Sequence, residues 1–460
     1  MRSTLPPVPV APLAMPPRPA RPLSSLGVLR VARGNSLAAC DEQLFDELIA
    51  ERRFLWYRAF FVSDPDGIRR VLLDNHENYP RIRHMRRVLE PAVGSGLLSS
   101  EGEIWRRHRR LVAPALDQRA ILPYAPLIVS LSEALADHLA AQPAGEPVNL
   151  ADAMTLLLTV TIARLFGDSR LEPLLGLFVA NSRGRRVLDF FQAPKWLHVV
   201  HGRDTLGAAG HAFDPLLFRL IAERRDPGYR GERDLLWRLA NSSDRGGDSL
   251  NDAEIRDEAA TLALGGVDTT MRGLVWAWYL LAMHPDAEAR LYGELDAVLG
   301  GRAPTVDDLP RLVYVRRVID EALRLYPPIP AMLRTAAESD TLCGRVIPRG
   351  ATIAVVPWVV HRHRKLWQDP DCFDPDRFAP EQVSTRSRFA YIPFALGPHI
   401  CVGASLALME MQLIIAVLAQ RFRFRLVPDH AVVPVGGFLT LRADRGLWCT
   451  IEPRHARSAA

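Results

Sequence analysis

The sequence lacks the cysteine pattern of a secreted, disulfide-bonded protein. Its five cysteines are an odd number, lie far apart and include no CxxC pair: Cys40, Cys343, Cys372, Cys401 and Cys449. Disulfide scaffolds carry an even number of cysteines at close spacings. Because disulfides are rare in reducing compartments, this pattern favours a cytoplasmic protein.

A long hydrophobic run is also lacking. A membrane-spanning helix needs about 18 or more apolar residues, and the longest near-continuous stretch, residues 273–283, is shorter. We therefore expect a soluble protein with no membrane span. Residues 1–25 contain eight prolines and no apolar core of signal-peptide type. They predict a disordered leader ahead of one domain over residues 26–460.

Two further absences narrow the function. The sequence has no internal repeat, which excludes solenoids and propellers. Much of its arginine lies at residues 81–87 and 106–110, and neither run has the interleaved aromatic residues of a nucleic-acid-binding stripe. We therefore expect no nucleic-acid partner. In the first run, Arg83, Arg86 and Arg87 either hold a substrate carboxylate or form a solvated face.

The hydrophobic content of 48% over 460 residues is enough for a large core. Length alone suggests about three domains, but motifs from Trp105 to Cys401 must converge if they serve one cofactor. We therefore predict one large helical domain, mainly α with small β-sheets (α+β). A capping pair, Asn251 and Glu254, predicts a long helix that ends at His284. Further predicted elements are a helix over 287–299 and strands over 345–347, 352–356, 422–426 and 447–451.

The run Phe394-Ala-Leu-Gly-Pro-His-Ile-Cys-Val-Gly403 offers one cysteine on a loop that opens into a helix over about 404–420. Free N–H groups at a helix N-terminus favour an ionised sulfur, which can bind a metal. Gly397 and Gly403 permit a tight turn and the close approach of a flat ligand, and Phe394 can shield the sulfur. The plainer alternative for Cys401 is an inert buried cysteine.

Three other constellations accompany this loop. Gly265 and Gly266 lie in the middle of the long helix, where each costs about 0.8–1.0 kcal/mol relative to alanine, and Asp268-Thr269 follows them. The alternative for this motif is a glycine kink with a satisfied threonine. The other two constellations are Glu321 with Arg324, followed by the run 373–378 that contains Arg377, and Trp105 with Arg109 one helical turn apart.

These motifs, in this order over about residues 55–455, resemble the cytochrome P-450 superfamily, whose haem loop reads Phe-x-x-Gly-x-Arg/His-x-Cys-x-Gly. The absence of an N-terminal anchor is similar to the soluble bacterial type. The resemblance implies haem b with an axial thiolate from Cys401, oxygen activation by Asp268 and Thr269, and a buried charge network of Glu321, Arg324 and Arg377. The other cofactor-binding positions that it implies are Trp105, Arg109, Arg334, His399, Phe394, Gly397, Gly403 and Gly265. A solvated turn arginine is the alternative for Arg334, and His399 would be a cation whose contact weakens as pH rises.

The resemblance implies a monooxygenase that inserts one atom of O2 into a small apolar substrate. Matching substrate-pocket positions are Phe190, Phe191, Ile329, Met332, Leu333, Phe438 and Leu439. Because one domain fills the chain, we expect a monomer served by a separate electron donor, a ferredoxin or flavodoxin-like protein with its reductase. On a helical wheel Arg106, Arg107 and Arg110 turn away from Trp105 and Arg109, which predicts a cationic docking face for that donor. The alternatives are a haem-thiolate isomerase, dehydratase or peroxygenase, and a non-enzymatic haem sensor.

Overall fold

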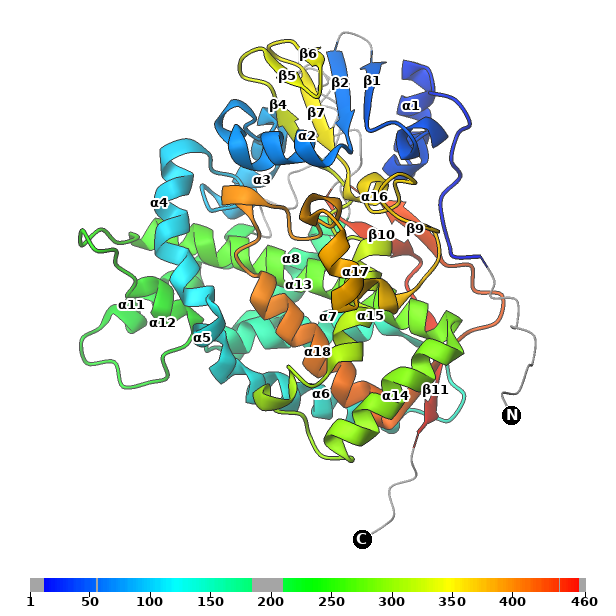
Figure 1. Cartoon of the computed structure of the whole chain (residues 1–460). Helices are drawn as coiled ribbons and strands as arrows, with labels where there is room; N and C mark the ends of the chain where they lie inside the picture. Colours follow the sequence, from blue (N-terminus) through cyan, green and yellow to red (C-terminus); the bar gives the residue numbers. More distant parts are fainter. Residues whose placement is uncertain (1–11, 55–56, 184–209, 438, 455–460) are drawn as a thin grey trace, which may run out of the picture.

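Helices dominate the chain, as the sequence predicts. The computed structural model describes residues 12–54, 57–183, 210–437 and 439–454. Its α-helices are α1 (Ser25–Ala32), α2 (Pro65–Arg69), α3 (Arg83–Val93), α4 (Gly102–Val112), α5 (Gln118–Ile121), α6 (Ala125–Ala140), α7 (Leu150–Leu165), α8 (Glu172–Arg183), α11 (Asp214–Arg225), α12 (Leu235–Ala240), α13 (Asp252–Met283), α14 (Pro285–Leu299), α15 (Val313–Leu325), α16 (Pro357–Val360), α17 (Pro380–Thr385) and α18 (Ala404–Arg421). Figure 1 shows most of them packed below a small sheet region, with α1 and α2 beside that region.

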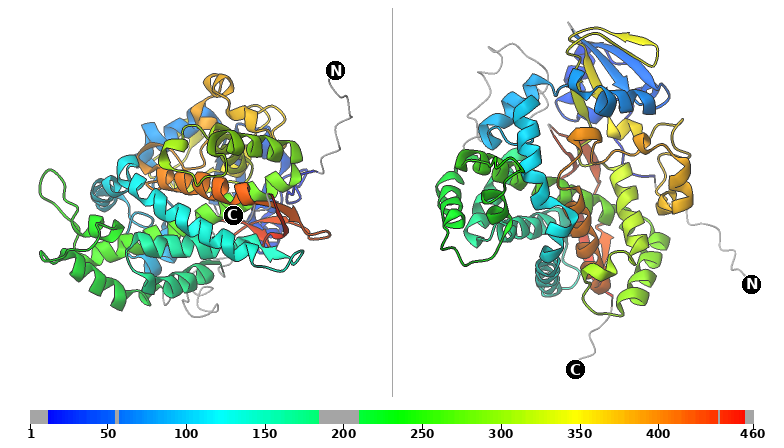
Figure 2. Two further views of the ribbon diagram at one scale, coloured as in Figure 1. Left: turned by 90° about the horizontal axis from the view of Figure 1, so that it is seen from below. Right: turned by 60° about the vertical axis from the view of Figure 1, so that its left-hand side comes forward.

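The strands form small sheets at the edges of the helical body (Figures 1 and 2). They are β1 (Ile49–Phe54), β2 (Tyr57–Val62), β3 (Val148–Asn149), β4 (Met332–Thr335), β5 (Asp340–Leu342), β6 (Arg345–Ile347), β7 (Thr352–Val355), β8 (Phe422–Leu426), β9 (Val433–Gly436), β10 (Leu441–Asp444) and β11 (Trp448–Pro453). The sheet orders are β1-β2-β7-β4, β3-β11-β8, β10-β9 and β5-β6. The predicted strands over 345–347 and 352–356 therefore belong to two different sheets.

Helix α13 forms the centre of the core, and its ends confirm the sequence prediction. Asn251 accepts a hydrogen bond from the backbone N–H of Glu254, and the Glu254 side chain accepts one from the N–H of Asn251. At the other end His284 caps the helix, and Pro285 begins α14. The helix spans 32 residues, which at about 1.5 Å per residue gives a rod of about 48 Å. It contacts α3, α7, α15 and α18, so its side chains can reach most parts of the domain.

Helix α18 follows the cysteine loop and packs against α6, α13 and α15. By length and composition alone, α18 and the segment Gln118–Ala140 are apolar enough to cross a membrane. Neither contains an unbroken apolar run of that length, so the sequence did not predict them as candidates. In α18, 67% of the most apolar window is buried inside the protein. Its hydropathy therefore belongs to a helix that contributes to the core.

The second half of the predicted disordered leader is instead packed against the domain. Tyr279 accepts a hydrogen bond from the N–H of Ala14, and the hydroxyl of Tyr326 donates one to the carbonyl of Ala14. Arg18 forms an ion pair with Asp371 and lies over the ring of Phe45. Residues 12–25 are thus part of the fold, because aromatic and acidic side chains far along the chain bind them.

Candidate functional site

The loop before α18 takes the tight turn that its glycines predict. Gly397 has φ +70°, and a Cβ there would lie 2.0 Å from the carbonyl oxygen of Leu72. This position therefore requires glycine for both conformation and space. Gly403 differs, since its φ is −91° and a Cβ would meet no described atom within 4 Å. Only the approach of a ligand gives Gly403 a role.

Cys401 lies two residues before Gly403, the N-cap of α18. Its backbone N–H donates to the carbonyl of Phe394 at 2.9 Å, which closes the loop. The Cys401 side chain is exposed, yet protein surrounds it on most sides, and this loss of water raises the pKa of the thiol. The N–H of Gly403 and the charge of Arg109 act in the opposite direction but do not outweigh it. The helix end thus favours the ionised sulfur, as predicted, but burial outweighs this effect; a bound metal would hold the sulfur ionised.

The two adjacent glycines of α13, Gly265 and Gly266, have different roles. A Cβ on Gly266 would lie 2.9 Å from Cδ1 of Ile162, so this glycine lets α13 pack closely on α7. Gly265 is exposed although it lies in a core helix, and a Cβ there would meet no described atom within 4 Å. The hydroxyl of Thr269 donates to the carbonyl of Gly265 at 2.5 Å, one turn back. The predicted hydrogen bond from Thr269 to the preceding turn is therefore present, and the helix surface beside it at Gly265 is exposed.

Asp268 is buried and held on two sides. Arg272 donates a hydrogen bond to Oδ1 at 2.8 Å, and the hydroxyl of Thr440 donates to Oδ2 at 2.8 Å. Thr440 lies in the turn between β9 and β10, so this turn is fixed against α13. Asp268 and Thr269 are neighbours in sequence, but their side chains have different partners. The Asp268 carboxylate binds Arg272 and Thr440, whereas the Thr269 hydroxyl binds the carbonyl of Gly265.

A cluster of basic side chains lies between α4 and β4. Arg81 donates to Nδ1 of His399 at 3.0 Å, and the rings of His399 and Trp105 are 3.8 Å apart. Arg334 is buried on β4 and is bridged to Arg81 through the backbone, which rules out a solvated turn arginine. Arg109, one turn after Trp105, is half-buried and near enough to Cys401 to interact with its charge.

The charge of His399 differs from the sequence prediction. Burial and the nearby guanidiniums of Arg81 and Arg334 lower the pKa of His399 to about 3, so its imidazole is neutral at pH 7. Nδ1 accepts the hydrogen bond from Arg81, which places the ring proton on Nε2. His399 therefore acts as a neutral hydrogen-bonding partner rather than a cation, because three arginines already occupy this region.

The basic cluster is short of acidic partners. Glu101 is 3.6 Å from Arg81 and 3.8 Å from His399. In the described part of the chain, no acidic side chain forms an ion pair with Arg109 or Arg334. Buried charges without partners are costly, so the cluster suits a guest with more than one carboxylate. Haem has two propionates and a flat ring, and the free sulfur of Cys401 and the open faces at Gly265 and Gly403 complete the fit.

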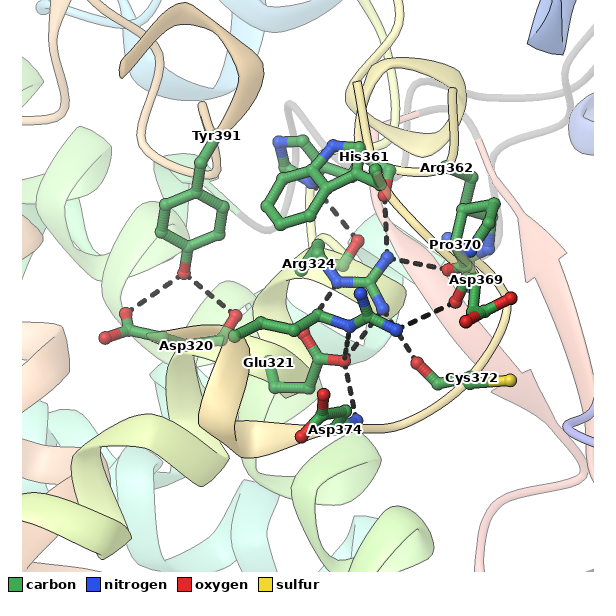
Figure 3. Close-up of polar contacts among 12 residues, drawn as sticks. Asp320, Glu321, Arg324, His361, Arg362, Asp369, Pro370, Cys372, Asp374 and Tyr391 are labelled. Carbon is green, nitrogen blue, oxygen red and sulfur yellow. Dashed lines mark hydrogen bonds and ion pairs between the residues drawn. The ribbon is translucent and has the colours of Figure 1, made fainter. Parts of the chain in front are cut away.

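Glu321, Arg324 and Arg377 come together as predicted. Figure 3 shows Glu321 and Arg324 at the centre of this network. Glu321 and Arg324 are fully buried and share two hydrogen bonds of 2.6 and 2.7 Å, and Nε of Arg377 is 3.4 Å from Glu321. Arg324 also donates to the backbone carbonyls of His361, Pro370 and Cys372. One guanidinium thus holds together α15 and the segment that leads to the cysteine loop. The role of the network is structural.

The substrate-pocket predictions are only partly covered by the described residues. Phe190, Phe191 and Phe438 lie outside them. Ile329, Met332, Leu333 and Leu439 are half-buried. The backbone N–H of Leu441 donates to the carbonyl of Pro328 at 2.9 Å, which places the β9–β10 turn beside the start of β4. The same turn contacts Asp268, so Leu439 and Ile329 lie on segments next to the glycine motif of α13.

The predicted cationic docking face on α4 is neutralised by acidic neighbours. Arg106 is paired with Glu77 and Glu103, Arg107 with Asp248 and Glu254, and Arg110 with Asp244. Three arginines are therefore paired with five carboxylates, so the local net charge of this face is −2. The helical wheel predicts the direction of these side chains but not their acidic partners, which lie before α3, on α4 itself and over residues 244–254.

Sequence reasoning missed three contributors to the site. Arg81 was seen only as part of an arginine-rich run, and no local signal separates it from its neighbours. Glu101 and Arg272 were not identified, because their partners lie on other elements or one turn away on a helix full of similar pairs. For Arg272 the i, i+4 spacing from Asp268 was the available signal.

A free cysteine just before a helix, a cluster of arginines suited to carboxylates and an exposed glycine on the central helix are together typical of a haem-thiolate protein. The cytochrome P450 family model matches residues 17–449, and the chain belongs to that family. Its members are haem enzymes in which a cysteine is the axial ligand, and they act as monooxygenases on O2 and a substrate with a separate redox partner.

Named relatives span bacteria and animals. The chain is 35% identical to cyclooctatin synthase of Streptomyces melanosporofaciens, over 80% of this chain and 81% of that protein. It is 32% identical to cyclooctat-9-en-7-ol 5-monooxygenase of the same organism (81% and 81%), and 31% identical to human cytochrome P450 4F12 (85% and 79%). Among solved structures, the haem domain of cytochrome P450DA aligns with a TM-score of 0.80 at 26% identity, covering 97% of this chain and 98% of that one.

Proposed function

We propose that this cytochrome P450 hydroxylates, or oxidises in a related way, a small apolar organic substrate, and that Cys401 is its haem ligand. The overall reaction is RH + O2 + 2e⁻ + 2H⁺ → ROH + H2O. Haem with a thiolate ligand supplies O2 binding and cleavage of the O–O bond. The supporting observation is the hydroxyl of Thr269 on the exposed turn at Gly265, where it can hold and pass a proton.

The substrate class follows from the pocket and from one relative. Ile329, Met332, Leu333 and Leu439 are apolar, and the exposed Arg83, Arg86 and Arg87 fit a solvated face better than a carboxylate site. Cyclooctat-9-en-7-ol 5-monooxygenase is named for a cyclic, unsaturated alcohol without a charged group. We therefore propose an uncharged, largely hydrocarbon substrate of that kind for this chain.

Three finer features stay proposals. The electron donor is a ferredoxin or flavodoxin-like protein with its reductase, the enzyme is a monomer, and it acts in the cytoplasm. All five cysteines are free, which agrees with a reducing compartment. Size-exclusion chromatography tests the monomer, and reconstitution with purified ferredoxins and flavodoxins tests the donor.

A haem-thiolate isomerase, dehydratase or peroxygenase needs no external electrons, and a haem sensor forms no product. Substrate-dependent consumption of reduced nicotinamide separates the proposed monooxygenase from all of these. The pair Asp268 and Thr269 favours the monooxygenase, since those alternatives need no protons delivered with electrons. Thr269→Ala should keep substrate binding but divert electrons to peroxide; unchanged coupling would contradict the role of Thr269.

The ligand assignment has its own test. Cys401→Ser should abolish the red-shifted carbon monoxide spectrum that a thiolate ligand gives to ferrous haem. Cys372→Ser is the matched control, because Cys372 is also exposed and free. If the spectrum survives in Cys401→Ser, another cysteine is the ligand and the proposal fails.

A further inference from the structure

The imidazole of His108 connects two glutamates of α13. Its Nδ1 lies 2.7 Å from Oε1 of Glu258, and its Nε2 lies 3.5 Å from Oε1 of Glu254. His108 and Glu258 are 1% and 0% exposed, whereas the Glu254 side chain is 25% exposed in the first turn of the helix. Only the Nδ1 contact is a hydrogen bond, and Nε2 has no hydrogen-bond partner among the described residues. With a carboxylate near each nitrogen, the imidazole can take up a proton on one nitrogen and release one from the other.

From these glutamates a polar stripe runs along α13 to the oxygen-activation motif. At about 100° per residue, the members of this stripe lie within an arc of about 80°: Glu254, Glu258, Thr261, Gly265 and Thr269. Neighbouring members are three or four residues apart, which corresponds to about 4.5–6 Å along the axis. One water molecule can span such a gap between two side chains. Gly265 has no side chain, so the eight residues from Thr261 to Thr269, about 12 Å along the axis, need a chain of several waters.

Thr261 lies on this stripe between Glu258 and Gly265. It is 8% exposed, and its hydroxyl has no hydrogen-bond partner among the described residues. A Cβ on Gly96 would lie 2.2 Å from this hydroxyl, so only the absence of a side chain at Gly96 leaves it room. One turn later Gly265 is open, and its carbonyl accepts the bond from Thr269. A buried hydroxyl of this kind is a normal site for an ordered water.

We propose that protons travel to Thr269 along a route made by Glu254, His108, Glu258 and Thr261. The inference rests on the proposed monooxygenase function, in which each turnover consumes two protons together with two electrons from the separate donor. A proton enters at Glu254, crosses His108 to Glu258, and reaches Thr269 along a chain of waters that begins at the hydroxyl of Thr261. Each transfer breaks one O–H or N–H bond and forms another, and solvent reprotonates Glu254. These residues act through Thr269, so they are relay residues.

The electrostatics of the pair suit proton exchange. Burial raises the pKa of Glu258. Burial alone would lower the pKa of His108, but its hydrogen bond to Glu258 and the charges of Glu258 and Glu254 raise it overall. The other charged neighbours are Asp257 beside Glu258 and Arg107, which donates to Glu254 at 2.7 Å. The segment before α4 contributes only the backbone N–H of Leu97, 3.3 Å from Glu258.

The first test removes the bridging hydroxyl. In haem-loaded protein with a ferredoxin, its reductase and cyclooctat-9-en-7-ol as the probe, the measurement is peroxide formed per reduced nicotinamide consumed. Thr261→Val should raise this ratio several-fold, and Thr261→Ser should return it to the wild-type value. Thr159→Val is the matched control, because Thr159 on α7 is also buried with an unpartnered hydroxyl. Equal ratios in Thr261→Val and wild type would overturn the proposal.

The second test needs no turnover. In the carbon monoxide complex of the reduced protein, ¹⁵N NMR should show His108 titrating above its ordinary pKa of about 6.5, and below it in Glu258→Gln. An unchanged titration in Glu258→Gln would show that the two groups do not exchange a proton, and would overturn the route. If the wild-type protein consumes electrons without forming product from any substrate, the proposed function fails, while the titration still decides the relay.

Discussion

Arg18 and Asp371 are 353 residues apart in sequence, yet Arg18 donates two hydrogen bonds to Asp371, of 3.1 and 2.7 Å. Asp371 lies between Pro370 and Cys372, whose carbonyls both accept hydrogen bonds from Arg324. The N-terminal segment is thus tied to the same stretch of chain that the buried Glu321–Arg324 pair holds. It contributes to the support of the cysteine loop from outside the core.

Arg18→Gln should therefore lower the free energy of unfolding by about 1–3 kcal/mol, because a bidentate, largely buried ion pair is lost and Asp371 keeps its charge. Equilibrium urea denaturation measures this change. Arg21→Gln is the matched control, since Arg21 is exposed on the same segment. Equal stability of the two variants would show that the Arg18–Asp371 ion pair does not stabilise the fold.

The elements that the sequence predicts well are those fixed by near neighbours. The ends of α13 depend on Asn251, Glu254 and Pro285, and the Glu321–Arg324 pair depends on spacing within one turn of α15. Such contacts are readable because the helix geometry alone brings the residues together.

Contacts between segments far apart in the chain could not be predicted from the sequence. The proline-rich composition of residues 12–25 predicts an extended chain, and nothing local shows that Tyr279 and Tyr326 will bind it. The neutral state of His399 depends in the same way on Arg81 and Arg334, which come from two other parts of the chain. The family motif predicts which residues hold the cofactor, but not which neighbours set their charge.

The two glycines of the cysteine loop should respond differently to alanine. Gly397→Ala places a Cβ against the carbonyl of Leu72 at a positive φ, and should destabilise the protein by about 1–3 kcal/mol or more, with or without haem. Gly403→Ala meets no described atom within 4 Å and should leave the haem-free protein as stable as wild type while weakening haem retention. Thermal unfolding of both forms and haem transfer to apomyoglobin measure the two effects. A stable Gly397→Ala protein would contradict the steric argument.

His361 should make folding sensitive to acid. Nε2 accepts from the N–H of Ile392 at 2.9 Å, so Nδ1 carries the proton and donates to the carbonyl of Arg324. Burial and the charge of Arg324 lower the pKa of His361 to about 3, against about 6.5 in the unfolded chain. Between these values the unfolded chain binds a proton that the folded protein does not. Stability contributed by neutral His361 is therefore present above pH 6.5 and falls as the pH is lowered.

One such group changes the free energy of unfolding by at most about 1.4 kcal/mol per pH unit. Urea denaturation at pH 7, 6 and 5 should show a smaller slope for His361→Gln than for wild type, since glutamine keeps an acceptor for Ile392 but does not titrate. His138→Gln, at an exposed histidine of α6, is the comparison for a general effect of the substitution. Identical slopes in wild type and His361→Gln would contradict the assignment.

Electron transfer should not depend on the arginine face of α4. Arg106 and Arg110 are each paired with carboxylates, and the local balance of three arginines against five acids is negative, so this face should not attract an acidic donor. Reversal of both arginines to glutamate should leave the first electron transfer at its wild-type rate at low salt. Stopped-flow reduction under carbon monoxide, at low and high ionic strength, measures that rate. The charge swap Arg110→Glu with Asp244→Arg is the matched control, because it keeps both the ion pair and the net charge. A slower rate in the double reversal that recovers with salt, while the swap behaves as wild type, would show that the donor docks on α4.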